Sequence, residues 1–380
     1  MLRLTTLFLT VALPFFVLFV PTAYAQKENL PWGVERIRAD QVWDTDWTQD
    51  FIANPGANSG QGVRVAVIDT GIASHPDLAG RVVDGVSYVV GKQYWEDDNG
   101  HGTHVAGTIA AIDNGNHLIG VAPRVFLYAV KVDPTNLDHV VAGIYWAVGK
   151  GVHIISMSLG SPEDYPPLKQ ACDYAYSQGV LLIAASGNSA DPVSYPAKYE
   201  SVVAVGATYS NDNRWEFSNY GPELEFAAPG VNINSTFPPN AYQKRTGTSH
   251  AVPHVTGTAA LIFASKVDPS YDLNRNGRWD NLEVREKLKD TALDLDGEGR
   301  DGYFGYGLVN AWYSNQRPPG DINYDLMVDV IDLSIVAFYY GTTPQDPQWW
   351  FGRRADINID NIIDIADISI VSMHYGEIDP

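Results

Sequence analysis

The chain has 380 residues, which is enough for a sizeable core and more than one domain, and 45% of them are hydrophobic. Its formal net charge of −20 repels phosphate groups, so the charge disfavours nucleic acid as a partner. The single cysteine, Cys172, excludes an intramolecular disulfide, and its place in a helical pattern favours a buried core position over a nucleophile.

The N-terminal segment predicts a secretory signal peptide over residues 1–25. Arg3 precedes a long apolar run, which ends in the small-x-small sequence AYA at residues 23–25. An uncleaved membrane anchor is the alternative, because the run is nearly long enough to span a bilayer. Pro14 and the cleavage-like end favour the signal peptide. We therefore expect a secreted, monomeric protein without a membrane anchor after cleavage.

Alternating strand and helix patterns predict an α/β domain over residues 26–315. Near-continuous β-branched runs that end in turn residues indicate strands buried on both faces of a parallel sheet: VRVAVIDTG, RVFLYAVKV, VHIISMSLG, VLLIAASGN and SVVAVGATY. Helical patterns lie between these runs: HGTHVAGTIAAI, LDHVVAGIYWAVGKG and PPLKQACDYAYSQG. The expected fold is a mostly parallel sheet with helices on both faces and a ligand site beyond the carboxyl ends of the strands.

Three polar side chains stand at strand ends or helix starts in this domain. Asp69 ends VAVIDTG, His101 opens the helix in DDNGHGTHVAG, and Ser249 opens the helix in GTSHAVPHVTG. Each alone has a structural explanation as a turn former, a helix-opening histidine or an N-cap. Together they follow one of the chain orders of the serine triad, in which histidine takes the serine proton and aspartate orients the imidazole. Pro253 is expected in the first helical turn, where a missing N–H costs nothing.

The segment from PWGVERI near residue 31 to GYGLVNA near residue 311 resembles the subtilisin-like serine proteases, or subtilases. The resemblance implies an endopeptidase that cleaves proteins or peptides through the triad, with Asn188 in AASGNSAD as the side-chain donor of the oxyanion hole. It implies structural roles for His104 and His254. It also implies substrate-binding residues, namely Ser158, Leu159 and Gly160 as backbone contacts and Ser194 at the floor of the specificity pocket.

Two features depart from the family pattern. The residue after the nucleophile is usually Met and is here His250, which removes an easily oxidised side chain and introduces a titratable one. Secreted subtilases commonly carry a prodomain of domain size, whereas only QKENL separates the predicted signal peptide from the mature-like start at Pro31 here. We therefore expect folding to depend on calcium or on a separate folding or inhibitor protein.

Residues 272–283, DLNRNGRWDNLE, match the EF-hand loop pattern and predict a calcium site, with a polar surface loop as the alternative. The expected ligands are Asp272, Asn274, Asn276, the carbonyl of Arg278, and Glu283. The subtilase resemblance implies a second calcium site near AIDNGNHLIG. Its implied ligands are the side chains of Asp77 and Asn114, the carbonyls of Ile112, Asn116 and Leu118, and Glu28 from the N-terminal segment.

A linker at residues 316–320 leads to an internal repeat over residues 321–380. DINYDLMVDVIDLSIVAFYYG at 321–341 recurs 35 residues later as DINIDNIIDIADISIVSMHYG. The repeat resembles a dockerin, an α-helical duplicated calcium module of EF-hand type that binds cohesin domains; a folded cap with no partner is the alternative. The resemblance implies calcium ligands at Asp321, Asn323, Asp325, Asp329 and Asp332 in the first loop and Asp356, Asn358, Asp360, Asp364 and Asp367 in the second.

Two other functions fit part of the sequence. A catalytically silent peptide-binding protein, anchored to a scaffold by its tail, is disfavoured by the complete set of triad residues. A serine hydrolase of another class, such as an esterase, is disfavoured because the G-x-S-x-G motif and the order Ser, Asp, His are both absent.

Overall fold

The computed structural model describes residues 30–43, 58–92, 94–114, 118–296, 299–315, 320–322, 327–343, 345–346, 348, 355–357 and 362–376. The predicted signal peptide lies outside the described residues, as do the expected calcium ligands Glu28, Asn116, Asn323, Asp325, Asn358 and Asp360. Among the helices in the described ranges, none has the length and apolar character needed to cross a membrane.

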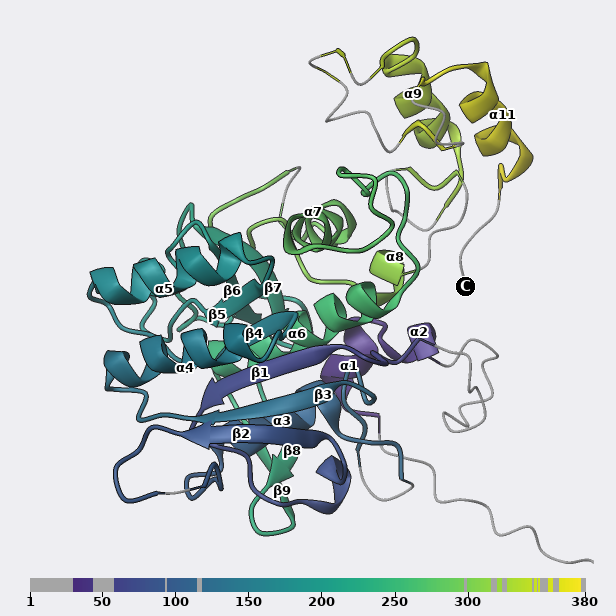
Figure 1. The fold of residues 1–380 in the computed structure, drawn as a ribbon. Coiled ribbons are helices and arrows are strands. Elements are labelled where there is room, and N and C mark those ends of the chain that lie inside the picture. The colour runs from purple at the N-terminus through teal and green to yellow at the C-terminus, as the bar shows by residue number, and fades with distance from the viewer. Residues whose placement is uncertain are drawn as a thin grey trace, which may run out of the picture.

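A seven-stranded parallel sheet forms the centre of the structure, in the order β2-β3-β1-β4-β5-β6-β7 (Figure 1). Its strands are β1 (Arg64–Asp69), β2 (Val82–Ser87), β3 (Phe126–Lys131), β4 (Ile154–Met157), β5 (Leu181–Ala185), β6 (Val202–Thr208) and β7 (Leu224–Pro229). The five predicted runs are β1, β3, β4, β5 and β6, so the expectation of a mostly parallel sheet is confirmed.

The sequence patterns missed the two edge strands. β2 is half-exposed, and the sheet register shifts between Val82 and Asp84, so its apolar pattern is interrupted. β7 is buried, but Glu225 breaks its apolar run and is paired with Arg285. A separate antiparallel hairpin of β8 (Ile233–Phe237) and β9 (Ala241–Arg245) was also not predicted.

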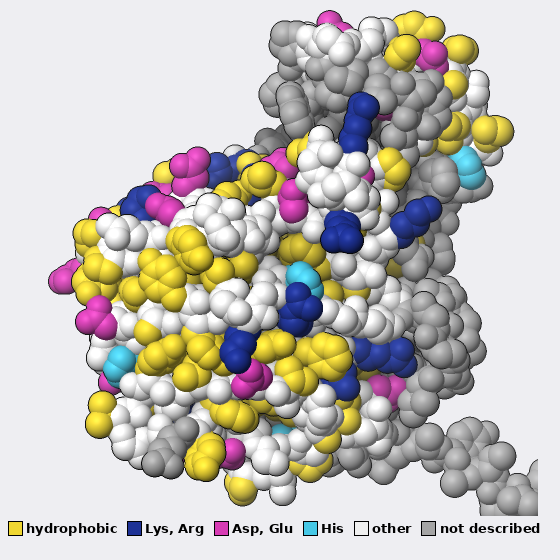
Figure 2. Space-filling view, in the orientation of Figure 1, with side chains coloured by type: hydrophobic (Ala, Val, Ile, Leu, Met, Phe, Trp, Pro, Cys, Tyr) yellow, Lys and Arg dark blue, Asp and Glu magenta, His cyan; other side chains and the backbone are white. Residues whose placement is uncertain are grey.

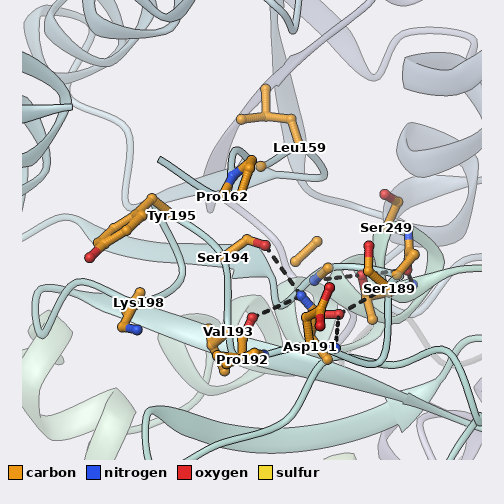
Figure 3. A pocket seen from close by; sticks show the side chains of 16 residues that line it. Leu159, Pro162, Ser189, Asp191, Pro192, Val193, Ser194, Tyr195, Lys198 and Ser249 are labelled. Carbon is orange, nitrogen blue, oxygen red and sulfur yellow. Dashed lines mark hydrogen bonds between the residues drawn. The ribbon is translucent and has the colours of Figure 1, made fainter. Parts of the chain in front are cut away.

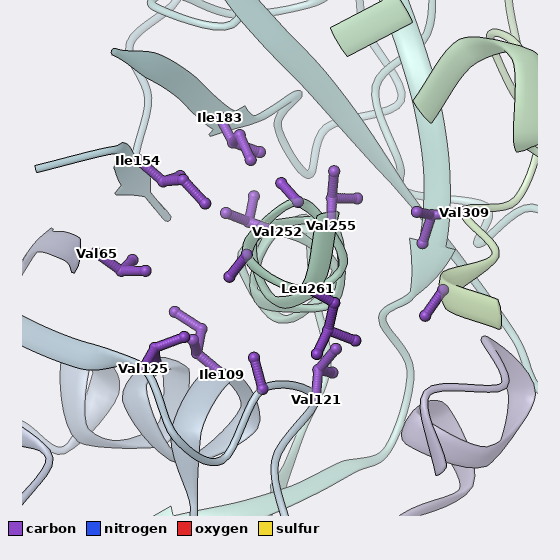
Figure 4. Packing of buried hydrophobic residues seen from close by; sticks show 14 of the residues in the cluster. Val65, Ile109, Val121, Val125, Ile154, Ile183, Val252, Val255, Leu261 and Val309 are labelled. Atoms are coloured by element: carbon purple, nitrogen blue, oxygen red, sulfur yellow. The ribbon is translucent and has the colours of Figure 1, made fainter. Parts of the chain in front are cut away.

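Helices cover both faces of the sheet, as expected. The helices of this part of the chain are α1 (Trp32–Arg36), α2 (Asp40–Trp43), α3 (His101–Ala110), α4 (Leu137–Gly149), α5 (Pro166–Ser177), α6 (Thr248–Ala264), α7 (Asn281–Thr291) and α8 (Ala311–Asn315), with the short 3-10 helix η1 (Pro76–Leu78). One buried cluster joins α3 and α6 to the sheet, where Val252 and Val255 of α6 lie near Ile154 of β4 and Ile183 of β5 (Figure 4). A second cluster packs α4 and α5 on the other face and includes the fully buried Cys172, a core residue as predicted.

The strand order places a candidate site at β1. From β1 the chain builds β2 and β3 on one side and then crosses to β4 on the other, so β1 is the point where the direction of winding reverses. In open parallel sheets, ligands bind beyond the carboxyl ends of the strands at such a point. Asp69 is the last residue of β1, Ser158 follows β4, and Asn188 comes three residues after β5.

The described part of the tail holds two equivalent helices, α9 (Val330–Phe338) and α11 (Ile365–Met373), whose limits are 35 residues apart. Asp329 and Asp364 cap their N-termini through equivalent capping boxes. The small buried core repeats the same offset, because Val328 and Val336 correspond to Ile363 and Val371. The internal repeat in the sequence is therefore also a repeat in helix capping and core packing.

Buried histidines predict that acid lowers stability. Burial lowers the pKa of His104, His153 and His254 to about 4. The unfolded chain has histidine pKa values of about 6.5, so from pH 6.5 down to about 4 it binds protons that the folded chain does not. We therefore expect the free energy of unfolding in urea, at saturating calcium, to fall as the pH is lowered through this window. A His153→Gln variant should show a shallower fall, and equal stability at pH 6.5 and pH 4 would contradict the prediction.

Candidate active site

Asp69 and His101 meet at the carboxyl end of β1. Nδ1 of His101 donates to Oδ1 of Asp69 at 2.8 Å and lies 3.0 Å from Oδ2. The carboxylate of Asp69 is buried and also accepts the N–H of Thr70 at 2.7 Å. The charge of Asp69 raises the pKa of His101 above its ordinary value, although burial opposes the effect. This arrangement leaves Nε2 of His101 to serve as a proton acceptor.

A buried carboxylate that the sequence motifs did not single out fixes the start of α3. Oδ1 of Asp97 accepts the N–H of Gly100 and the hydroxyl of Thr70, both at 2.9 Å, and Oδ2 accepts the N–H and hydroxyl of Thr103 at 2.9 and 2.6 Å. Gly100 has a φ of 94°, a conformation that glycine adopts without strain. Asp97 thus links the residue after Asp69 to the first turn of α3 and sets the position of His101.

Ser249 is the second residue of α6 and is tied to Ser158 by two reciprocal hydrogen bonds. The hydroxyl of Ser249 donates to the carbonyl of Ser158 at 3.0 Å, and the hydroxyl of Ser158 donates to the carbonyl of Ser249 at 2.8 Å. The hydroxyl of Ser249 must therefore be redirected before it can donate to His101. Catalytic hydrogen bonds commonly form only when substrate is present.

Pro253 does not lie in the first turn of its helix, where the sequence pattern predicted it. Its actual position explains why the hydroxyl of Ser158 donates to the carbonyl of Ser249. The helix begins at Thr248, so Pro253 is its sixth residue and lies beyond the first turn. A proline at this place removes the helical hydrogen bond to the carbonyl four residues earlier, which is that of Ser249. The hydroxyl of Ser158 supplies the missing donor.

Asn188 lies beside the start of α6 with its side chain fixed in one orientation. Its Oδ1 accepts the N–H and the hydroxyl of Thr248, both at 2.9 Å. The amide group of Asn188 makes no hydrogen bond to the described part of the chain, and the side chain is exposed. A fixed, uncommitted N–H donor next to a candidate nucleophile is the geometry that an oxyanion hole requires.

A cavity of about 550 Å³ opens beside Ser249 (Figure 3). Of the predicted substrate-binding residues, Leu159, Gly160 and Ser194 line it, whereas Ser158 is buried against Ser249. The lining also includes Asn219, whose amide donates to the hydroxyl of Ser194 at 3.3 Å. No local sequence signal marks Asn219, because its side-chain hydrogen bonds are all with residues far from it in the chain.

His250 does not behave as the titratable group expected from the sequence. Burial, together with repulsion from the positive charges that His104, His101 and Arg245 can carry, keeps the pKa of His250 well below its ordinary value, so the side chain stays neutral near neutral pH. Its ring lies 4.5 Å from that of His104. His104 is structural, as predicted, since its Nε2 donates to the carbonyls of Ile233 and Gln243 at 3.0 and 2.9 Å.

His250 predicts resistance to oxidation. A methionine at this position would lie next to the nucleophile, where conversion to the polar sulfoxide disrupts packing. We expect the parent protein to keep more of its activity after exposure to peroxide than a His250→Met variant does. The measurement is residual peptidase activity against time in peroxide, with Met157→Leu as a control for oxidation elsewhere. Equal inactivation of the parent and His250→Met would contradict the prediction.

The loop at 272–283 has donor groups that fit calcium. Asp272 accepts the N–H groups of Asn276 and Gly277, both at 2.9 Å, and Gly277 has the φ of 68° that a sharp turn requires. Glu283 accepts the N–H groups of Leu273 and Asp280 at 2.9 and 3.0 Å. The carboxylates therefore turn toward the interior of the loop. The expected ligands of this loop include amide and carbonyl oxygens as well as carboxylates. In the described ranges no group of three or more His, Cys, Asp or Glu side chains is arranged to hold a metal ion.

The tail loops repeat this hydrogen-bonding pattern. Asp332 accepts the N–H groups of Ile322 and Asp329 at 2.6 and 2.8 Å. Asp367 accepts those of Ile357 and Asp364 at the same distances. Both aspartates are the twelfth residues of their loops, as Glu283 is of its own. Of the other described expected ligands, Asp321 and Asp356 are buried, whereas Asp329 and Asp364 are partly exposed and cap α9 and α11.

The implied family calcium site is partly assembled. Oδ1 of the buried Asp77 accepts the amide of Asn114 at 3.1 Å, and Oδ2 accepts the hydroxyl of Tyr242 at 2.7 Å. The carbonyl of Asp77 accepts the N–H of Ile112 at 2.7 Å, while Leu118 is buried just beyond the undescribed residues 115–117. The structure thus brings Asp77, Ile112 and Asn114 together.

Comparison with known proteins identifies relatives that match most of the chain. The sequence pattern of the subtilase family matches residues 60–307. Subtilisin BL of Lederbergia lenta is 44% identical over 289 residues, which cover 75% of this chain and 98% of that protein. Subtilisin DY of Bacillus licheniformis is 45% identical over 293 residues, covering 74% and 97%. An alkaline protease of Alkalihalobacillus alcalophilus is 44% identical over 289 residues, covering 75% and 69%.

Proposed function

Because the chain belongs to the subtilase family and is a serine-type endopeptidase, we propose that Asp69, His101 and Ser249 are its catalytic triad and that Asn188 donates to the oxyanion. The 2.8 Å hydrogen bond between His101 and Asp69, at the strand end facing the start of α6, is the observation that carries the proposal. The subtilisin relatives also support secretion to the cell exterior.

The proposed reaction uses each group in turn. Nε2 of His101 takes the hydroxyl proton of Ser249 as Oγ attacks the carbonyl carbon of the substrate. The amide of Asn188 and backbone N–H groups at the start of α6 stabilise the oxyanion that forms. His101 then protonates the leaving amine as the C–N bond breaks and the acyl-enzyme forms. In the second half His101 takes a proton from the water that attacks the acyl carbon and returns it to Oγ of Ser249 as the ester bond breaks. Asp69 stabilises the protonated imidazole in both halves.

We propose two kinds of contact with the substrate, one to its backbone and one to a side chain. The segment after β4 that contains Ser158, Leu159 and Gly160 would pair with an extended peptide. The side chain that precedes the cleaved bond would enter the cavity beside Ser249, between apolar walls that include Leu159 and Val193 and with Ser194 at its floor.

The nucleophile is tested by covalent labelling. The folded protein would be treated with phenylmethylsulfonyl fluoride in millimolar calcium, and the modified peptide identified by mass spectrometry. We expect a single adduct on Ser249 that appears in step with the loss of peptidase activity. An adduct on another serine, or inactivation without an adduct on Ser249, would contradict the proposed triad.

We also propose that calcium stabilises the fold, through the loop at 272–283 and the site around Asp77. Bound calcium supplies a positive charge that neutralises clustered carboxylates and fixes loop conformation. Glu283 lies in the first turn of α7 and accepts the N–H of Leu273 at the start of the loop. Its replacement should therefore remove the contact that ties the start of the loop to this helix.

Removal of calcium is expected to lower the melting temperature of residues 26–380. A Glu283→Gln variant should gain less from added calcium than the parent does, because it loses a ligand charge. The exposed Glu163→Gln serves as the matched control. Equal calcium dependence of the melting temperature in Glu283→Gln and Glu163→Gln would exclude the 272–283 site. Refolding to full activity in EDTA would exclude a requirement for calcium.

For the tail we propose a dockerin-like module that binds a cohesin-type scaffold partner. Hydrophobic side chains are exposed on the tail (Figure 2). Several of these residues lie 35 positions apart in the sequence, at equivalent places in the repeat. Phe338 is 74% exposed and corresponds to Met373, which is 72% exposed. Calorimetry of the full chain with cohesin domains, in calcium and in EDTA, tests the proposal; no binding in calcium would favour a folded cap without a partner.

A further inference from the structure

Asn219 is buried, with 2% of the residue's surface exposed, and its side chain directs all of its hydrogen bonds to one loop. Its Oδ1 accepts the N–H groups of Ser189 and Asp191 at 2.9 and 3.1 Å. Its amide donates to the carbonyl of Pro192 at 2.9 Å and to the hydroxyl of Ser194 at 3.3 Å (Figure 3). The loop belongs to the segment that follows β5, whereas Asn219 lies between β6 and β7.

Few hydrogen bonds within the loop hold its shape, and its backbone is otherwise bonded to the backbone of residues 217–220. It is closed where the N–H of Ser194 donates to the carbonyl of Ser186 at 2.9 Å. Within it Ala190 has a φ of 54°, which is unfavourable for a residue with a Cβ atom. Gly187 has a φ of 114°, and a Cβ there would lie 2.3 Å from the amide nitrogen of Asn219. The side chain of Asn219 therefore fills the interior of the loop and leaves room only for glycine at position 187.

We propose that Asn219 is a positioning residue that sets both the oxyanion donor and the specificity pocket. Its carbonyl oxygen holds the half of the loop that directly follows Asn188. Its amide nitrogen holds the half that ends at Ser194 in the cavity beside Ser249. This inference rests on the proposed function of Asn188 and Ser194.

The two halves predict separable effects. Displacement of Asn188 weakens a contact made in the transition state, so it lowers kcat for every substrate; a misplacement of about 1 Å can cost roughly a hundredfold. Displacement of Ser194 alters the pocket wall, so it changes the relative rates for large and small side chains before the cleaved bond. A purely structural role would lower stability and leave both quantities unchanged per folded molecule.

Three variants of the full chain distinguish these outcomes. Asn219→Ala removes all four side-chain hydrogen bonds. Asn219→Asp keeps the two acceptor bonds and loses the two donor bonds. Asn310→Ala, away from the cavity, removes another buried asparagine whose Oδ1 accepts the N–H of Tyr313 at 3.1 Å and serves as the stability control. Active-site titration would give kcat per folded site, on two peptide anilides that differ only in phenylalanine or alanine before the cleaved bond.

We expect Asn219→Ala to lower kcat at least about tenfold on both substrates. Asn219→Asp should mainly lower the ratio of kcat/KM for phenylalanine over alanine, by about fivefold, and it carries the test if Asn219→Ala does not fold. Asn310→Ala should lower the melting temperature with both quantities retained. Unchanged kcat and an unchanged ratio in the Asn219 variants would overturn the inference. An inactive, folded parent would instead overturn the proposed site itself.

Discussion

Replacement of Ser249 by alanine is expected to lower kcat by about a million-fold, the size that the equivalent change has in the related subtilisin. The change removes the oxygen that attacks the substrate, while the cavity and the segment after β4 remain in place. KM should therefore change little. The measurement is release of chromophore from a peptide anilide by purified residues 26–380 in millimolar calcium, with circular dichroism to verify folding.

The control for this variant lies directly after the last residue of the same helix. Ser265 follows the last turn of α6, and its hydroxyl donates to the carbonyl of Ile262 at 2.7 Å. Ser265→Ala should thus cost some stability and retain full activity. Substantial activity in Ser249→Ala would contradict the proposal and would point to another nucleophile. Inactivity of a folded parent would be equally decisive against the triad.

The fold and the chemical groups of the site could be predicted where the signal is local. β1, β4 and β5 are near-continuous apolar runs, and Asp69, His101 and Ser249 each stand at the junction of such a run or helix with a turn. That these junctions meet follows from the strand order, which places the ends of β1, β4 and β5 side by side. The calcium loop predicted at 272–283 rests on the same kind of local signal, since all of its expected ligands lie within twelve consecutive residues.

The groups that orient these residues were not predictable, because they act across the chain. The hydrogen bonds between Ser158 and Ser249 join residues 91 positions apart. The bond to the carbonyl of Ser249 forms because Pro253 is the sixth residue of α6, which was not known until the start of the helix was known. Asn219 contacts its loop from about 25 to 30 positions away. β7 was missed because the charge of Glu225 looks incompatible with a buried strand until Arg285 is brought to it by the fold.

Asn188 is the second position at which we expect a large effect. Its amide is the only side-chain donor proposed for the oxyanion, and its orientation depends on the two bonds from Thr248. Replacement by alanine should lower kcat by about a hundred- to a thousand-fold with KM nearly unchanged, as the loss of this donor does in subtilisin, which corresponds to about 2.7–4 kcal/mol. We expect kcat to fall while KM stays nearly unchanged because the negative charge on the oxyanion develops in the transition state and is absent from the bound substrate.

Two further variants separate the donor from its support. Asn188→Asp keeps an oxygen for the bonds from Thr248 but replaces the donor with a negative charge, so it should lower kcat at least as much as Asn188→Ala does. Thr248→Val removes one of the two bonds that orient Asn188 and keeps the donor, so its loss should be smaller. If Asn188→Ala instead raised KM and left kcat intact, Asn188 would be contributing to ground-state binding and the oxyanion would have to be stabilised by backbone N–H groups alone.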